Sequence, residues 1–237
     1  MKKIYYLLSL VILLNSSVLF ASDWSSTNLQ FLRGSDYKLG PKERTIMTLE
    51  HASGWKYGDN HFFFDITNPD SKDTAVYGEF TPSLSVAKLL GKDISKNLIN
   101  DYRVVANAEF GNQIRTYLYG FGVSFNVKNF KFLKANLMIR DKPEVKGSTY
   151  QLTIAWLLPF EIGKTRFHFT GFTDLAGKEG SKAANQLIVP QLLIDVGNYW
   201  NSADCILVGV EYQYWKNKFG AKGTTESVPQ AMMKFYF

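Results

Sequence analysis

The sequence predicts an all-β fold: a transmembrane, antiparallel, up-and-down β-barrel of about 12 strands that follows a cleaved signal peptide. Three observations predict it. The N-terminus has the pattern of an export signal, the rest of the chain is divided into short runs of alternating apolar and polar residues, and the last run ends in the aromatic residue Phe237. We therefore expect a signal peptide over residues 1–21 and one barrel domain over 22–237.

The export signal begins with two lysines, followed by an apolar run from Ile4 to Leu14, and Ala21 stands at the predicted cut. A transmembrane helix needs roughly 20 apolar residues and this run is about half as long, so cleavage is favoured over a membrane anchor. The residue after the cut is Ser22 rather than a cysteine, which argues against a lipoprotein.

Composition excludes several classes of protein. With 46% apolar and 20% charged residues, the chain fits neither a disordered protein nor a bundle of membrane helices. The single cysteine, Cys205, cannot form an internal disulfide, and His51, His61 and His168 lack metal-ligand spacing, so no metal or cofactor is expected. Lysines are spread along the chain, which argues against a nucleic acid polymer as partner.

Twelve alternating runs follow the signal peptide. They cover residues 24–33, 44–53, 60–68, 75–88, 99–110, 114–127, 131–140, 149–160, 165–174, 186–196, 205–216 and 228–237. Removing 21 of the 237 residues leaves 216, or 18 for each of 12 strands with its connection. This length suits strands of about 9–11 residues tilted across a membrane. The fourth run stands out as long, and its end is expected to be a turn.

Within each run, ionisable residues share one parity and large apolar residues share the other. The apolar parity holds Phe62, Phe64 and Ile66; Phe80, Leu84 and Val86; Tyr102, Val104, Ala106, Ala108 and Phe110; Leu133, Ala135, Leu137 and Ile139; Tyr150, Leu152, Ile154, Trp156 and Leu158; Phe167 and Phe169; and Val208, Val210, Tyr212 and Tyr214. A soluble β-sandwich would alternate in the same way, so alternation alone does not select the barrel.

Three further features favour the barrel over the sandwich. The chain carries an export signal and ends in an aromatic strand, the strand count is even, and aromatic residues gather near strand ends as interfacial girdles do. The girdle candidates are Trp24, Trp55, Tyr57, Tyr150, Trp156, Phe160, Tyr199 and Trp200.

The connections give partial support. If the first strand runs outward, the outer loops follow the odd strands, and most of these are long and charged: 34–43, 68–73, 141–148, 176–184 and 218–227. Turns after even strands, such as 127–130 and 161–164, are expected to be short. The connection 111–113 is an unexpectedly tight outer turn.

The polar parity would line the lumen with charges of both signs and with aromatic rings. Charges of opposite sign can pair across strands and hold the wall, and this set includes Lys134 and Lys234. Aromatic faces beside hydrogen-bonding groups suit small planar polar solutes such as nucleosides, although a sugar is not excluded. The candidate solute-contacting residues are Glu50, Phe63, Asp65, Tyr77, Glu79, Arg103, Glu109, Arg140, Arg166, His168, Phe172, Asp174, Glu211, Gln213, Trp215 and Tyr236.

Eight stretches together carry a family resemblance. They are 24–30 (WSSTNLQ), 44–51 (RTIMTLEH), 62–66 (FFFDI), 77–82 (YGEFTP), 156–160 (WLLPF), 190–195 (PQLLID), 211–220 (EYQYWKNKFG) and 227–237 (SVPQAMMKFYF). With these stretches the chain resembles the nucleoside-specific channels of the bacterial outer membrane, the Tsx-like channels, and within them the OmpK-type proteins.

This resemblance implies a monomeric, twelve-stranded barrel for passive uptake of nucleosides or deoxynucleosides. It also implies contact with outer-membrane lipid, recognition of Phe237 by the barrel-assembly machinery, and outer loops that phages of some bacteria use as receptors. The outer loops of this chain look trimmed relative to the best-known members.

Two other functions stay open from the sequence. One is a structural or surface-receptor barrel, for phage or adhesion, whose pore is plugged by its own side chains. The other is a lipid-modifying enzyme of the outer membrane, for which His51 and Ser53 are the only nearby pair and no acid partner is evident. The prediction is therefore a channel and not an enzyme.

Overall fold

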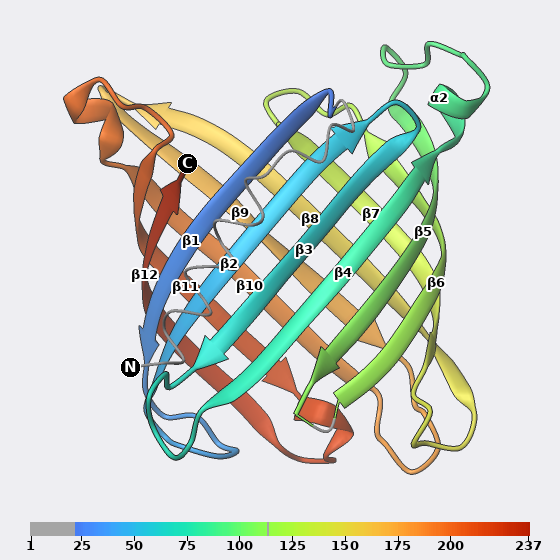
Figure 1. Cartoon of the computed structure of the whole chain (residues 1–237), viewed down its shortest axis with the longest axis vertical. Helices are drawn as coiled ribbons and strands as arrows, with labels where there is room; N and C mark the ends of the chain where they lie inside the picture. Colours follow the sequence, from blue (N-terminus) through green and yellow to red (C-terminus); the bar gives the residue numbers. More distant parts are fainter. Residues whose placement is uncertain (1–21, 113) are drawn as a thin grey trace.

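In the computed structural model, which describes residues 22–112 and 114–237, twelve antiparallel strands close into one barrel (Figure 1). The strands are β1 (Trp24–Gly34), β2 (Arg44–Trp55), β3 (Gly58–Thr67), β4 (Ala75–Ser85), β5 (Ile99–Gly111), β6 (Ile114–Phe125), β7 (Phe132–Asp141), β8 (Ser148–Ile162), β9 (Thr165–Ala176), β10 (Asn185–Asp195), β11 (Ile206–Lys216) and β12 (Thr225–Tyr236). The predicted fold class is confirmed. The predicted signal peptide, residues 1–21, lies outside the described residues.

Each strand pairs with its neighbours in the sequence, and β1 pairs with β12 to close the barrel. In that closing pair Phe31 lies opposite Met233 and Asn28 lies opposite Tyr236. Closure gives every strand in the described residues a neighbour on both sides, so the sheet has no open edge strand there, as a spanning sheet in lipid requires.

The predicted runs match the strands to within three residues at each end. One of the largest differences is at β4, which ends at Ser85 because the Ser85 hydroxyl caps the short helix α2 (Val86–Leu89) by accepting from the Lys88 amide at 3.1 Å. The other is at β12, which begins at Thr225 rather than at residue 228. None of the helices in the described residues has the length and apolar content needed to cross a membrane.

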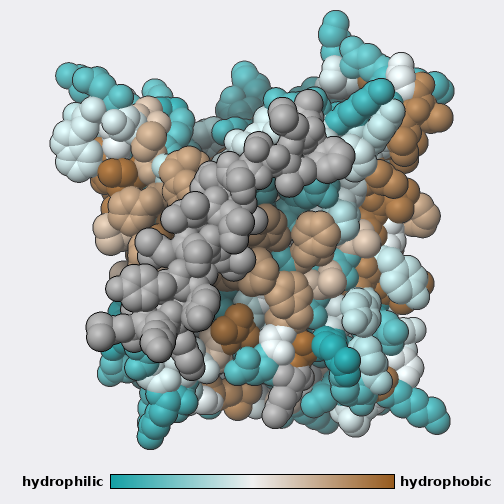
Figure 2. Space-filling model, viewed as in Figure 1, coloured by the Kyte–Doolittle hydropathy of each residue, from teal (hydrophilic) through white to brown (hydrophobic). Residues whose placement is uncertain are grey.

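Burial shows which parity faces outward. In β5, the side chains of Tyr102 and Val104 are exposed, whereas Arg103 and Asn107 are buried. A soluble sandwich would bury the apolar parity, so the observed pattern places apolar residues against lipid and polar residues inside the barrel. Figure 2 shows apolar residues across the middle of the visible wall and hydrophilic residues towards both ends.

The barrel has two ends, which we call the terminal mouth and the distal mouth. At the terminal mouth β1 begins and β12 ends, and the segments 86–98 and 196–205 connect strands there. The distal mouth carries the segments 35–43, 68–74, 142–147, 177–184 and 217–224. Strand β5 ends and β6 begins at the same mouth, where the sequence predicted a tight turn over 111–113.

The expectation of short turns at the terminal mouth is correct for 56–57 and 163–164 but wrong for two connections. Segment 86–98 contains α2, and segment 196–205 contains the 3-10 helix η1 (Gly197–Trp200). The second is held by the buried carboxylate of Asp195, which accepts from the amides of Asn198 at 3.1 Å and Asp204 at 2.9 Å. Local caps thus stabilise connections that strand alternation does not predict.

Candidate functional site

The sixteen predicted lumen residues lie on the inward parity of their strands. Polar contacts between strands that are not neighbours in the sheet identify this face, because such contacts can form only across the inside of the barrel. Arg140 on β7 contacts Glu109 on β5 at 2.5 Å, and Lys134 on β7 contacts Asp59 on β3 at 2.9 Å. The side-chain placement predicted from parity is therefore correct, and the solute-binding role of these residues stays a prediction.

Towards the terminal mouth, the carboxylate of Asp59 joins four strands. It accepts from Arg103 of β5 at 2.5 Å, from Lys134 of β7 at 2.9 Å and from Ser83 of β4 at 2.6 Å. Asp59 is not among the predicted lumen residues because the third predicted strand begins at residue 60, whereas β3 begins at Gly58. Asp59 has the same parity as Phe63, so extending the alternation by one residue would have found it.

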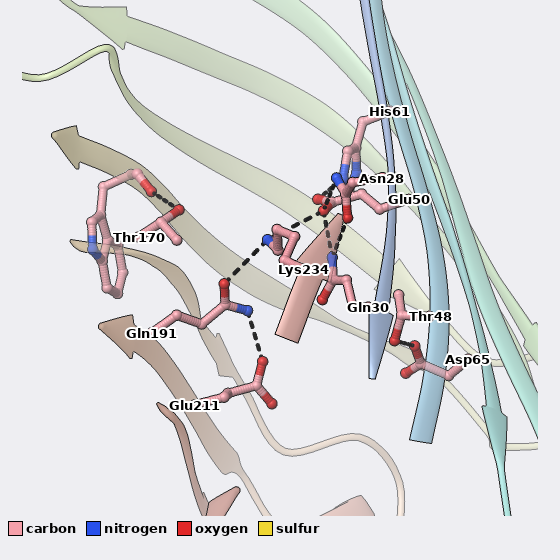
Figure 3. A network of polar contacts seen from close by, with 11 residues as sticks. Asn28, Gln30, Thr48, Glu50, His61, Asp65, Thr170, Gln191, Glu211 and Lys234 are labelled. Atoms are coloured by element: carbon pink, nitrogen blue, oxygen red, sulfur yellow. Dashed lines mark hydrogen bonds and ion pairs between the residues drawn. The ribbon is translucent and has the colours of Figure 1, made fainter. Parts of the chain in front are cut away.

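A second polar network crosses from β3 to β11 (Figure 3). Glu50 accepts from Asn28 at 3.0 Å and from Gln30 at 2.7 Å, and its other oxygen lies 3.1 Å from His61 Nε2. Neutral amides supply much of this network. Apart from Gln213, the predicted lumen residues are ionisable or aromatic, so these amides were not among them.

Lys234 of β12 continues this network to the other side of Figure 3. Its Nζ lies 3.6 Å from Glu50 Oε2 and 3.3 Å from Gln191 Oε1, and Gln191 in turn donates to Glu211 at 2.7 Å. The network therefore joins the two carboxylates Glu50 and Glu211 through one cation and one amide.

Four lumen carboxylates, Asp65, Glu79, Asp174 and Glu211, accept hydrogen bonds from neutral donors. Thr48 donates to Asp65 at 2.6 Å, Tyr77 and Asn107 to Glu79 at 2.7 and 2.8 Å, Thr153 to Asp174 at 2.5 Å, and Gln191 and Gln230 to Glu211 at 2.7 and 2.8 Å. Within the part of the chain that the structure describes, none of the four lies within 4.0 Å of a cationic group.

Three predicted residues, Arg103, Glu109 and His168, are buried in the wall. Glu109 receives both guanidinium nitrogens of Arg140, at 2.5 and 2.9 Å. His168 Nε2 lies 3.0 Å from Asp204 in the terminal connection. These contacts match the wall-holding pairs expected of a mixed-sign lumen.

Arg166 is placed beside the terminal mouth. Its guanidinium lies 3.5 Å from Asp195, the last residue of β10, and 3.6 Å from Asp204 in the connection 196–205. Arg166 and His168 thus attach that connection to β9, at one end of the lumen rather than in its middle.

The aromatic candidates have different neighbours. The rings of Phe63 and Tyr77 lie 5.9 Å apart at a tilt of 53°, and both are partly exposed on neighbouring strands. Trp215 donates from Nε1 to Asn185 at 3.3 Å, and Tyr236 packs against a cluster of buried aliphatic side chains. Phe172 is partly exposed on the inward parity of β9.

That aliphatic cluster was not expected in the lumen. Leu32, Leu193, Leu207 and Met232 point inward from β1, β10, β11 and β12, and none is more than 5% exposed. A smaller cluster of Val105, Leu118 and Met138 lies inside β5, β6 and β7. The prediction of an entirely polar and aromatic lumen was therefore incomplete.

The described residues meet the requirements of neither a Ser/His catalytic site nor a metal site. His51 Nδ1 lies 2.8 Å from Thr27 Oγ1, and its ring stacks on the outward-facing Phe62 at 5.1 Å, so it contacts a hydroxyl and an aromatic ring rather than a carboxylate. In the described ranges, no group of three His, Cys, Asp or Glu side chains is arranged to hold a metal ion.

Residues 21–235, nearly the whole chain, match the family described as nucleoside-specific channel-forming protein, Tsx. The chain belongs to this family. It is accordingly an outer-membrane β-barrel that forms a channel for small solutes. Among curated protein sequences, none matches the chain significantly.

Two solved structures share the fold. The chain is similar to the "KdgM porin", with a TM-score of 0.55, 10% identity and coverage of 90% of this chain and 99% of that one. It is also similar to the "NanC porin", with a TM-score of 0.57, 10% identity and coverage of 88% and 98%. At this identity the likeness concerns the fold alone.

Proposed function

We propose that the protein passes nucleosides across the outer membrane by passive diffusion through its lumen. The observation that carries the proposal is the partly exposed Phe63–Tyr77 pair beside the carboxylates of Asp65 and Glu79. Together with the family name, this combination of ring faces and hydrogen-bond acceptors favours a solute with one flat apolar face and several hydroxyl or amino donors.

A nucleoside has both parts. Its base can stack on an aromatic ring, and its ribose hydroxyls and exocyclic amines can donate to carboxylate oxygens. Glu79 has one oxygen bonded to the Tyr77 hydroxyl and the other to Asn107, and each oxygen keeps a further lone pair that can accept from a solute. Weak binding at such a place lets the solute enter and leave.

The terminal mouth is proposed to face the periplasm, because an even-stranded outer-membrane barrel keeps both ends of its chain there. The distal segments would then face the outside, where a solute enters. Recognition of Phe237 by the assembly machinery and any binding of phage stay predictions.

The test is single-channel conductance of the refolded mature protein in a planar bilayer, titrated with thymidine, adenosine and maltose. We expect a saturable fall in current with both nucleosides and little change with maltose. Equal block by maltose would contradict nucleoside preference.

Phe63→Ala tests the ring directly, and Phe64→Ala is its control because Phe64 is the adjacent residue and faces outward. Stacking of a base on an aromatic side chain contributes about 1–3 kcal/mol, so the half-blocking nucleoside concentration should rise at least fivefold in Phe63→Ala. It should stay near the wild-type value in Phe64→Ala. Unchanged block in both variants would remove Phe63 from the site.

A structural barrel with a plugged pore is the second candidate, and the buried aliphatic cluster inside β1, β10, β11 and β12 is the observation that favours it. Absence of conductance from protein that is demonstrably folded in the bilayer would support this candidate over the channel.

A further inference from the structure

Two residues of segment 35–43, Tyr37 and Lys38, contact the wall inside the distal mouth. Strand β1 ends at Gly34, opposite Gln230. In the direction of the distal mouth, β12 continues beyond this point as far as Thr225. The end of β12 therefore extends past the end of β1, and Tyr37 and Lys38 contact its inward side. The Tyr37 hydroxyl donates to Gln230 Oε1, and the Lys38 amide donates to Glu226 at 2.8 Å.

Tyr37 is the residue that attaches this segment to the wall. It is only 2% exposed. Gly34 leaves room for it, because a Cβ on Gly34 would lie 3.1 Å from the Tyr37 hydroxyl and 2.9 Å from Gln230 Cγ. The Arg44 guanidinium lies over the Tyr37 ring, 4.2 Å from its centre, and donates to the carbonyls of Leu39 and Pro41. Both ends of the segment are thus held.

Glu226 joins this segment to a second distal connection. Its buried carboxylate accepts from the Lys38 amide, from Gln213 at 2.6 Å and from the buried ammonium of Lys218 in segment 217–224. Burial lowers the pKa of Lys218, and its bond to the Glu226 carboxylate opposes that shift. A buried ion pair under the segment gives it a fixed position.

Charged groups of the lumen face the segment. Burial is the main cause that raises the pKa of Tyr37; the Arg44 cation lowers it, and the carboxylates of Glu211, Glu226 and Asp65 raise it. Arg44 is partly exposed on the inward parity of β2. Arg44 therefore places a cation beside Tyr37 on the inward side of the distal mouth.

We propose that segment 35–43, together with Arg44 at the start of β2, is the constriction that limits the size and charge of the solute at the distal mouth, with Tyr37 as its attachment and Arg44 as the side chain that borders the opening. This inference rests on the proposed channel function and adds residues that set its selectivity.

Arg44→Cys tests which residues border the opening, in a Cys205→Ser background that removes the natural thiol. A bulky methanethiosulfonate reagent should lower its single-channel current roughly twofold or more, because current follows the narrowest open cross-section. Thr45→Cys is the matched control, since Thr45 has the outward parity and bonds to the exposed Arg33. Equal effects at both positions, or no effect at Arg44→Cys, would overturn the proposal.

Tyr37→Ala tests the attachment. Releasing the segment should raise the conductance by roughly twofold and admit larger sugars in a liposome-swelling assay. Tyr212→Ala removes the same phenol from the outer face and should leave both values unchanged. Wild-type conductance in folded Tyr37→Ala would count against the proposal, as would an equal rise in both variants.

These outcomes are separable from the proposed function. Ion current reports the constriction even if nucleosides do not block the wild-type pore, and that failure alone would defeat only the nucleoside assignment. Conversely, block of the wild-type pore together with an inert Arg44→Cys would keep the channel and remove the constriction.

Discussion

The two sides of the lumen are built differently. On the packed wall, formed by β10, β11, β12 and β1, inward side chains such as Leu193, Leu207 and Glu226 are completely buried. On the open wall, formed by β3, β4, β8 and β9, inward side chains such as Phe63 and Asp174 are partly exposed. Both walls have the same alternation of inward and outward side chains, so the alternation alone does not determine whether an inward side chain is buried or exposed to the lumen.

A narrow barrel can combine a stable fold with passage of a solute because the two walls have separate roles. The packed wall resembles half of a soluble core, with aliphatic contacts and a buried ion pair that stabilise the fold. The open wall keeps aromatic rings and carboxylates in contact with the space that a solute would cross. Variants on each wall should therefore change different measured quantities.

The largest effect is expected from Glu226→Gln, which leaves the buried Lys218 ammonium without its carboxylate. Removing one partner of a buried pair costs about 3–5 kcal/mol of unfolding free energy. Urea unfolding in phospholipid vesicles, followed by tryptophan fluorescence, measures it. Glu43→Gln, in the exposed pair with Arg33, is the control and should lose about 0–1 kcal/mol. Similar losses in both variants would contradict the packed-wall description.

A smaller effect is expected from Leu193→Ala, which opens a cavity in the packed wall. Truncating a buried leucine costs about 2–5 kcal/mol, and we expect the lower part of this range because lumen water can fill the cavity. Phe172→Ala on the open wall should cost about 1 kcal/mol or less in the same unfolding assay, because its ring is already partly in contact with solvent. A larger loss from Phe172→Ala than from Leu193→Ala would reverse the comparison.

The smallest effect is expected on ion selectivity. The open-wall carboxylates of Glu79 and Asp174 lack a cationic partner within 4.0 Å in the described residues, so the pore should prefer cations. In a salt gradient, the reversal potential should show this preference and move towards zero in Asp174→Asn. Glu144→Gln, which changes an exposed carboxylate paired with the exposed Arg115 on the outer side of β6, should not move it. An anion-selective wild-type pore would refute the expectation.

The strands and their inward faces were predictable because both depend on local pattern. Side chains on a strand alternate with period two, and a barrel in lipid needs one apolar parity. The outward direction of Tyr102 and the inward direction of Arg103 can therefore be predicted from their positions in the strand, without any knowledge of distant contacts. The same logic placed Phe63, Glu79 and Asp174 in the lumen.

The barrel, its strand number and the parity that faces inward could all be predicted from the sequence, because they follow from the spacing of neighbouring residues. Which inward side chains are buried depends on contacts that form only in the folded barrel. The contacts of Asp59 with Arg103 and Lys134, and of Tyr37 with Gln230, join residues that are distant in the chain. Such contacts depend on the register of strand pairing and on the path of a connection inside the mouth, and neither has a local periodicity in the sequence.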